Sequence, residues 1–136
     1  MKKEMADIEN NHFVSLCRKN YQDLLIVCTV RKYLRNAIEK PAIIDYVRKE
    51  FVRLNKHFKD EEMWLFPNLA STNDLRLQAE QQHKKLRELA NDNNLQPEEF
   101  ADLLEEHIRF EERVLFPLFE NTVNEKSNMP DNTKVL

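Results

Sequence analysis

Glycine is absent from this sequence of 136 residues. Phosphate-binding loops such as G-x-G-x-x-G and the P-loop depend on glycine, so neither can be built here. Tight two-residue hairpins need positive φ angles and favour glycine, so its absence also argues against a sheet of hairpins. The sequence therefore predicts an all-α fold, and its length predicts a single domain.

Long apolar runs and a large excess of one charge are also lacking. The longest apolar stretch, residues 24–28, is far shorter than the roughly 20 residues needed to cross a bilayer. The first seven residues contain no apolar segment of the kind found in secretion signals. The formal net charge is −3, which predicts no binding to nucleic acid or to a membrane surface. We therefore expect a cytoplasmic protein.

Cysteine is scarce, and Cys17 and Cys28 are the only two. They lie in one predicted helix, about 16 Å apart at a rise of ~1.5 Å per residue, which is too far for a disulfide between them. We expect two reduced thiols that line the core.

Proline and asparagine divide the chain into four amphipathic stretches. Their periodic apolar positions predict helices over about 7–36, 40–67, 71–90 and 96–122, with a kink at Pro117. Four helices with three short connections predict an up-down-up-down four-helix bundle. Residues 1–123 are expected to form this domain, and residues 124–136, which lack periodicity, a flexible C-terminal tail.

One eleven-residue motif occurs twice. His57-Phe-Lys-Asp-Glu-Glu-Met-Trp-Leu-Phe-Pro67 recurs fifty residues later as His107-Ile-Arg-Phe-Glu-Glu-Arg-Val-Leu-Phe-Pro117, with six of eleven positions identical. Residues four apart share one face of a helix, so His57 projects with Glu61, and His107 with Glu111. Alternate helices of such a bundle run in the same direction, so the two motifs can face each other at one height.

Both His–Glu pairs fall inside apolar stripes. Burying unpaired carboxylates costs several kcal/mol, and no Lys or Arg lies on these stripes at the same height, so we expect a bound cation. His83 lies on the apolar stripe of the third predicted helix, level with His57 and His107. His12, on the first predicted helix, fits this common height less well. About 26 residues lead from His12 to the first turn, but only about 17 lead from that turn to His57.

The predicted ligand set takes one His from each helix and the first Glu of each motif: His12, His57, Glu61, His83, His107 and Glu111. Imidazole and carboxylate together suit iron, manganese and zinc. Six ligands are too many for one tetrahedral ion with an open position, but they suit two ions bridged by two carboxylates. We expect two iron ions that share an oxo or hydroxo group and keep one open position each, with zinc and manganese as alternatives.

Other residues near the motifs have ordinary explanations. Glu62 and Glu112 are rotated about 100° from the predicted ligands, so we expect them in solvent or paired with Lys or Arg, and Glu80 is a spare carboxylate. Four aromatic residues are expected to pack in the core and keep the site dry: Phe58, Trp64, Phe110 and Phe116. Three tyrosines could donate to a bound ligand, and nothing in the sequence selects one of them: Tyr21, Tyr33 and Tyr46.

This arrangement resembles the hemerythrin-like, HHE cation-binding family. H-x-x-x-E occurs twice, with single His residues on the two other predicted helices, and the resemblance covers residues from about 8 to 122. The family's ligands map onto the same six residues, and the 45-residue step from His12 to His57 fits the longer-spaced branch of the family. Ferritin-like carboxylate proteins use the reverse order, E-x-x-H.

The resemblance implies a non-haem di-iron protein. Oxygen-carrying hemerythrins have a second His four residues before the one on the third helix, where this chain has Ala79. The pattern is closer to di-iron proteins of iron–sulfur-cluster repair and nitric oxide response, and to hemerythrin-like iron sensors. The expected role is handling of nitric oxide, oxygen, peroxide or iron under stress, with a small diatomic or peroxide ligand. The alternative is a module that binds oxygen reversibly, or senses iron or oxygen, without turnover. The sequence indicates no catalytic residue and no protein partner.

Overall fold

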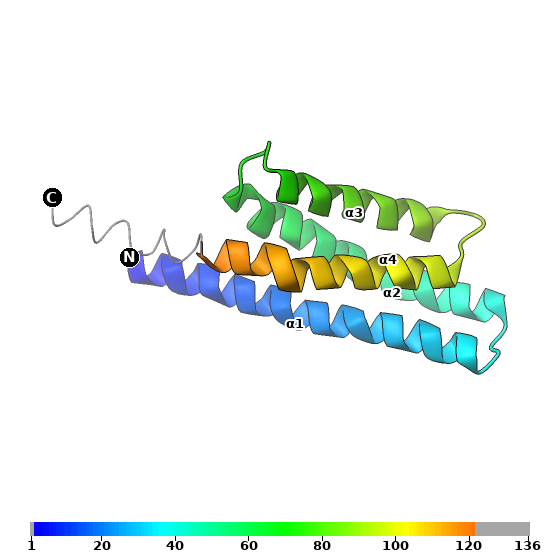
Figure 1. Cartoon of the computed structure of the whole chain (residues 1–136). Helices are drawn as coiled ribbons and strands as arrows, with labels where there is room; N and C mark the ends of the chain where they lie inside the picture. The colour runs from blue at the N-terminus through cyan, green and yellow to red at the C-terminus, as the bar shows by residue number, and fades with distance from the viewer. Residues whose placement is uncertain (1, 122–136) are drawn as a thin grey trace, which may run out of the picture.

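The computed structural model describes residues 2–121, and among these the side chains of residue 15 and residues 17–121. The four main helices are α1 (Lys2–Arg35), α2 (Lys40–Asp60), α3 (Asp74–Asn91) and α4 (Pro97–Phe110), and the described residues contain no strand (Figure 1). The predicted all-α four-helix bundle is confirmed. The boundary at residue 123 and the predicted tail, residues 124–136, lie outside the described residues.

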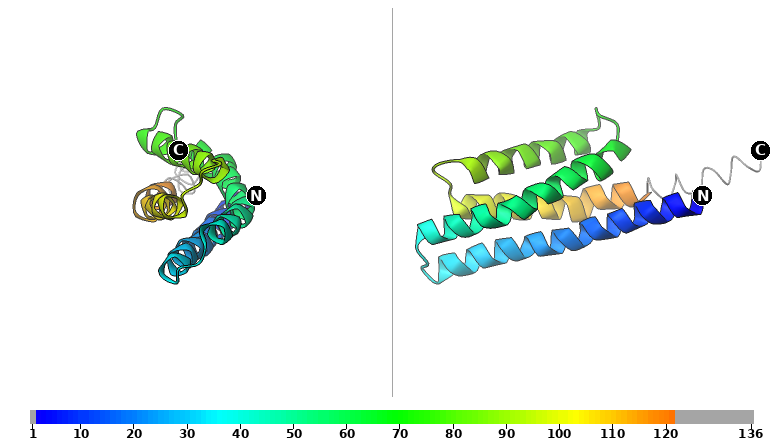
Figure 2. Two further views of the ribbon diagram at one scale, coloured as in Figure 1. Left: turned by 90° about the vertical axis from the view of Figure 1, so that its right-hand side faces the viewer. Right: turned by 180° about the vertical axis from the view of Figure 1, so that it is seen from behind.

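Successive helices run in opposite directions (Figure 2). α1 packs mainly against α4 and also against α2, α3 packs against both α2 and α4, and α2 contacts α4 across the bundle. The start of α1 and the α2–α3 connection lie at one end, while the α1–α2 and α3–α4 connections lie at the other (Figure 1). α2 and α4 therefore run in the same direction, and their repeated motifs face each other.

The helix ends follow from their residues. The Asn73 side chain accepts hydrogen bonds from the backbone N–H groups of Leu75 and Arg76, which caps the start of α3. Pro41 and Pro97 occupy the first turns of α2 and α4, where a missing N–H costs no hydrogen bond. These three starts agree with the prediction to within a few residues, and α1 begins five residues earlier than expected.

The end of α1 contains a left-handed residue that is not glycine. Ala37 has φ 56°, and the N–H of Ile38 donates to the carbonyl of Tyr33 at 3.0 Å. The N–H of Ala37 donates to the carbonyl of Leu34 at 3.3 Å. Together these bonds form a Schellman motif, a helix end that usually takes glycine at the left-handed position. Because the chain has no glycine, alanine fills this position at a steric cost.

Both repeated motifs end in a π-helical turn, η1 (Glu61–Leu65) in the first and η3 (Glu111–Leu115) in the second. The N–H of Phe66 bonds to the carbonyl of Glu61, and the N–H of Phe116 to that of Glu111, each across five residues. A short 3-10 turn, η2 (Phe66–Asn68), follows η1, whereas residues 116–121 return to α-helix.

The predicted kink at Pro117 is therefore misplaced, because the irregular turn begins six residues earlier. A proline ring crowds the carbonyl four residues before it, so a helix must loosen on the N-terminal side of the proline. Pro67 stands in the same place after η1, which explains why both motifs share the turn.

The core consists of two apolar clusters. The larger contains Phe58 of α2, Leu86 of α3 and Ile108 of α4. The smaller contains Leu65 of η1, Ala79 of α3 and Leu115 of η3. Each of these residues lies about two helical turns from its counterpart in the larger cluster. On each of these helices the His or Glu residues of the predicted site lie between the two clusters. The site is thus a polar layer between two apolar ones.

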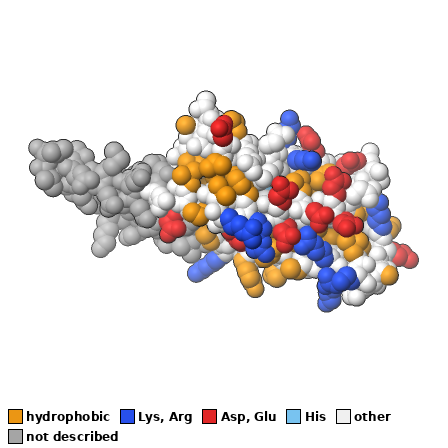
Figure 3. Space-filling view, viewed as in Figure 1, with side chains coloured by type: hydrophobic (Ala, Val, Ile, Leu, Met, Phe, Trp, Pro, Cys, Tyr) orange, Lys and Arg blue, Asp and Glu red, His pale blue; other side chains and the backbone are white. Residues whose placement is uncertain are grey.

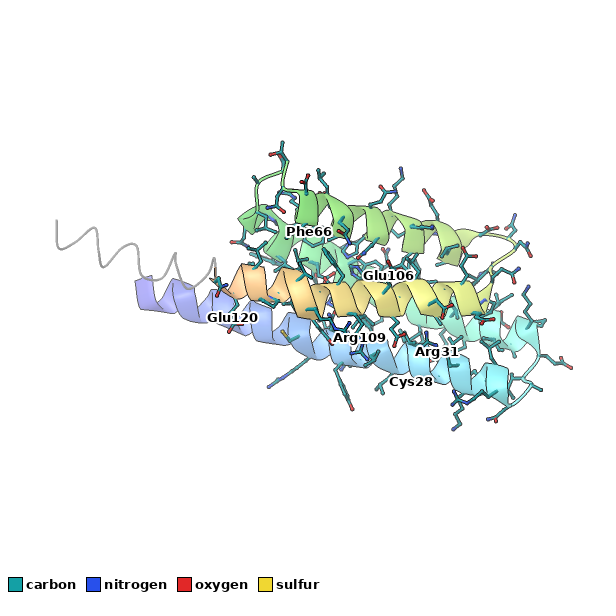
Figure 4. The ribbon with its side chains drawn as sticks, in the orientation of Figure 1. Cys28, Arg31, Phe66, Glu106, Arg109 and Glu120 are labelled. Carbon is teal, nitrogen blue, oxygen red and sulfur yellow. The ribbon has the colours of Figure 1, made fainter. Side chains whose placement is uncertain are left out.

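Two expectations about the core are wrong. Cys17 and Cys28 are exposed, because the buried stripe of α1 follows Asn20, Asp23 and Val27 and leaves both thiols off it. Figure 4 shows Cys28 on the side of α1 that faces away from α3. Trp64 is 49% exposed, because it lies in η1 on the side turned away from the buried residues Glu61 and Leu65.

The described surface has no dominant charge on the face in Figure 3, where acidic and basic side chains alternate. Ion pairs such as those of Arg31 with Asp102 and Glu105 join α1 to α4 across this region. Within residues 2–121, none of the helices combines the length and the apolar character that crossing a bilayer requires.

Candidate metal centre

Five of the six predicted ligands meet in the polar layer, and all five side chains are at most 2% exposed. Donor atoms of four of them, Glu61, His83, His107 and Glu111, lie within 4.8 Å of one another. The fifth, His57, places Nε2 3.4 Å from Oε2 of Glu61. The side chain of His12 lies outside the described residues, so its role as a ligand stays a prediction.

Glu61 occupies the middle of the layer. Its Oε1 lies 2.8 Å from Nε2 of His83 and 3.8 Å from Nε2 of His107. Within the second motif, Nε2 of His107 lies 3.2 Å from Oε1 of Glu111. Imidazoles from α2, α3 and α4 therefore surround one carboxylate, and the spacing of four residues brings each motif's own His and Glu together as predicted from helical geometry.

Each of the three described imidazoles has an oxygen acceptor at Nδ1. Oδ2 of Asp23 contacts Nδ1 of His57. Oε2 of Glu62 lies 2.7 Å from Nδ1 of His83, and Oε1 of Gln82 lies 2.6 Å from Nδ1 of His107. An acceptor at Nδ1 keeps the proton on that nitrogen and turns the Nε2 lone pair toward the centre, which is how histidine ligands of metals are usually oriented.

Two of these acceptors, Asp23 and Gln82, are absent from the predicted site. Asp23 had a signal in the sequence, because it interrupts a stripe of α1 that continues with Val27 and Val30, both fully buried. Gln82 had none, since a polar residue beside His83 is ordinary on a mostly polar helix. Contacts of this kind depend on the register between helices, which periodicity does not reveal.

The remaining carboxylates pair with arginine as expected. Arg87 donates to both oxygens of Glu62, at 2.7 and 3.0 Å, although the further contact of Glu62 with His83 was not foreseen. Nη1 of Arg109 lies 3.2 Å from Oε2 of Glu112. Nε of Arg76 lies 3.5 Å from Oε1 of Glu80, so Glu80 belongs to the surface.

Burial dominates the electrostatics of the layer. Burial, and then the nearby Glu111 carboxylate, raise the pKa of Glu61 well above its usual range. Burial is also the largest influence on Glu111 and opposes its ionisation, but the attraction of His107, the hydrogen bonds from Glu61 and His107 and the attraction of His83 together outweigh it and lower the pKa of Glu111. Of the two carboxyl groups, Glu61 is therefore the one that takes up a proton more readily without metal, and in that form it can donate to Nε2 of His83. Burial lowers the pKa of His83 to about 4 despite the neighbouring Glu62, so this imidazole is neutral at pH 7.

The unpaired atoms of the layer indicate what it binds. Both oxygens of Glu111, Oε2 of Glu61, and Nε2 of His57 and His107 have no hydrogen-bond partner among the described residues. No described Lys or Arg forms an ion pair with Glu61 or Glu111. Buried donors and acceptors are normally satisfied, and metal bound in the layer would give these atoms partners. Nitrogen and oxygen donors of this kind fit iron, manganese or zinc.

The comparison with known proteins supports the same conclusion. Residues 22–119 match the family described as the hemerythrin HHE cation binding domain. The chain belongs to this family. The match includes the five predicted ligands that meet in the layer, whereas residue 12 lies before it. No curated protein and no solved structure matches the chain significantly. Family membership and the buried donor cluster together make this a hemerythrin-like metal-binding protein.

Aromatic rings enclose the centre of this hemerythrin-like domain. Phe58 stacks on His83 with the ring centroids 4.1 Å apart, and Phe66 stacks on the same imidazole at 5.2 Å. Figure 4 shows Phe66 in the region between α3 and α4. Phe58 and Phe116 are buried as expected, and Phe110 is partly buried. Tyr33 and Tyr46 pack against each other near the α1–α2 connection and Tyr21 is exposed, so these tyrosines do not line the centre.

Proposed function

We propose that this protein holds two iron ions in its polar layer and handles nitric oxide, oxygen, peroxide or iron under stress. The ligands are His57, Glu61, His83, His107 and Glu111, together with His12, which the family resemblance implies. The observation that carries the proposal is the set of buried carboxylate oxygens and imidazole nitrogens that lack partners among the described residues. Bound iron would supply the ligand-binding and redox chemistry.

The donor set supports the proposal of two ions. Two glutamates from facing helices offer four oxygens between imidazoles from three helices, an arrangement suited to two bridged ions. Manganese and zinc bind the same donors, so occupancy after purification depends on metal supply as well as affinity. The protein's own residues hold and orient the ions, while Phe58 and Phe66 keep water away from His83.

The first experiment counts metal. The purified protein is loaded with Fe(II) without oxygen, desalted and analysed for elements, and we expect two irons per chain. Glu111→Ala should lose both ions, because in the proposed site the Glu111 carboxylate would bind both of them. Glu112→Ala is the matched control, since Glu112 is exposed and pairs with Arg109, and it should keep both. Clearly less than one iron per wild-type chain would contradict the proposal.

The second experiment identifies the chemistry. Nitric oxide, oxygen or peroxide is added separately to the reduced, iron-loaded protein, and optical and Mössbauer spectra follow the iron. Release of nitrous oxide would establish a nitric oxide reductase. In that reaction two nitric oxide molecules, two protons and two Fe(II) ions give one nitrous oxide, one water and two Fe(III) ions.

The alternative function is reversible oxygen binding, or sensing of iron or oxygen, without turnover. One observation favours it. Among the described residues, no Lys, Arg or Tyr contacts Glu61 or Glu111, so the layer has no obvious separate proton donor. A stable oxygen adduct that dissociates when oxygen is removed would support this alternative over an enzyme.

A further inference from the structure

α1 contributes an unexplained polar side chain to the core. Asn20 is 1% exposed, and neither Oδ1 nor Nδ2 has a hydrogen-bond partner among the described residues. It lies three residues before Asp23 and seven before Val27, on the buried stripe of α1. A buried carboxamide with no partner is costly, so its presence calls for a partner of another kind.

The register of α1 places Asn20 beside the metal centre. One turn after it, Asp23 contacts Nδ1 of His57, and directly before it, Nζ of Lys19 lies 2.7 Å from Oδ2 of Asp60. α1 also contacts η1, the turn that begins with Glu61. Asn20 lies between these two contacts along α1, and therefore at the height of Glu61.

A second neighbour flanks Asn20 from the side of α4. Although the Cys17 side chain is exposed, partial desolvation and then the Glu111 carboxylate raise the pKa of its thiol, which lies three residues before Asn20. This part of α1 therefore lies near Glu111 of the second motif. The contacts of Asp23 with His57 and of Lys19 with Asp60 bracket Asn20 along α1 at the height of the layer.

We propose that the Asn20 carboxamide lines the open side of the metal centre and hydrogen-bonds to the small anion or diatomic ligand held there. This inference rests on the proposed function, because the ligand binds through the metal. A carboxamide is neutral and offers both N–H donors and an oxygen acceptor. It can therefore donate to an anionic ligand, or accept from one that carries a proton, without adding charge to the centre.

The test uses azide, a small anion, as the probe. Wild type and Asn20→Leu are loaded with iron, oxidised and titrated with azide, and the azide-to-iron charge-transfer absorption is recorded. We expect equal iron content and an azide Kd at least tenfold higher in Asn20→Leu. Asn36→Leu is the control, because Asn36 is exposed at the far end of α1, and its Kd should match wild type.

A measurement on the metal-free protein guards against loss of folding. Replacing an unpaired buried amide by an apolar side chain of similar size should leave the thermal midpoint of Asn20→Leu equal to or above that of wild type. Asn20→Ala, which makes room for water, provides a second variant, and we expect it to bind azide more weakly than wild type as well.

The outcomes separate the two proposals. Iron-loaded wild type that binds no azide, or variants that bind it as wild type does, would overturn the role of Asn20 and leave metal binding intact. Loss of iron from Asn20→Leu would also overturn it, by making Asn20 a metal ligand. Wild type that holds no iron would refute the proposed function, and the role of Asn20 with it.

Discussion

The three described imidazoles of the metal centre are held by chemically different acceptors. His57 has the carboxylate of Asp23, which Arg53 also binds, and His83 has the carboxylate of Glu62, which Arg87 also binds. His107 has the neutral amide of Gln82. A carboxylate acceptor increases the basicity of the imidazole more than an amide does. Two of the imidazoles therefore share one kind of support, a carboxylate that an arginine also binds, and the third has a neutral acceptor.

Removal of the Asp23 carboxylate should weaken metal binding. For Asp23→Ala we expect a loss of about 10–100-fold in iron affinity, because Nδ1 of His57 loses the acceptor that orients the ring. Affinity is measured by competition with a chelator of known strength. Asp102→Ala also removes a carboxylate that pairs with an arginine, Arg31, but on the surface, and it should bind iron as wild type does. Equal losses in both variants would show that Asp23 does not position His57.

At the residue scale, the sequence predicts contacts within a helix well and contacts between helices poorly. The contacts of His57 with Glu61 and of His107 with Glu111 were predictable, because a spacing of four residues is set by local geometry. The contacts of Asp23 and Gln82 with these imidazoles were not, because they depend on which residue of a neighbouring helix lies opposite. The position of His12 relative to the layer depends on the same register between helices. Residue 12 lies about 12 Å along α1, at ~1.5 Å per residue, from residue 20, which is at the height of Glu61.

At the scale of elements, the lack of glycine has a visible cost at the end of α1. Ala37 holds a left-handed conformation that costs an alanine roughly 1–2 kcal/mol. Ala37→Gly should therefore raise the free energy of unfolding by about 1 kcal/mol, after allowance for the greater freedom of glycine in the unfolded chain. Urea denaturation of the metal-free protein measures the change. Ala42→Gly, in the exposed first turn of α2, should lower stability instead.

The π-helical turns offer a second test at this scale. A π turn contains one residue more than the α-helical turn it replaces, so deletion of exposed Arg113 from η3 should restore an α-helix. Leu115 and Phe116 would then keep their buried positions, and we expect a folded protein by circular dichroism. Deletion of exposed Glu106 from regular α4 should instead rotate His107 out of the core and abolish the cooperative thermal transition. If both deletions unfold the protein, the turn does not act as a one-residue insertion.

At the scale of the whole molecule, the bundle was predictable because its signals are local. Apolar periodicity, the caps at residues 71–74 and the prolines mark four helices, and short connections leave few ways to pack them. The position of the polar layer between two apolar clusters was only implied by the apolar stripes of the predicted helices. The positions of η1 and η3 were not predictable, since Pro67 and Pro117 signal an interruption without showing where the helix widens.

Metal should contribute substantially to the stability of the whole bundle. A ligand that binds only the folded state at 1,000 times its Kd adds about 4 kcal/mol, which for a domain of this size raises the thermal midpoint by roughly 10–15 °C. We expect this difference between iron-loaded and chelator-treated protein in scanning calorimetry. The difference should vanish in Glu111→Ala and persist in Glu112→Ala. Equal midpoints for loaded and stripped wild type would contradict a buried site.

The proposed ligands lie on both sides of the α3–α4 connection, so bound metal would link the two parts of the chain. His57, Glu61 and His83 precede the exposed residues 91–94, whereas His107 and Glu111 follow them. A chain cut in this connection would leave two pieces, each with an incomplete set of donors. Their reassociation should then depend on free metal, and a chelator should release the α4 piece during gel filtration. With metal bound as proposed, the intact protein would be two fragments joined twice, once by peptide bonds and once by coordination.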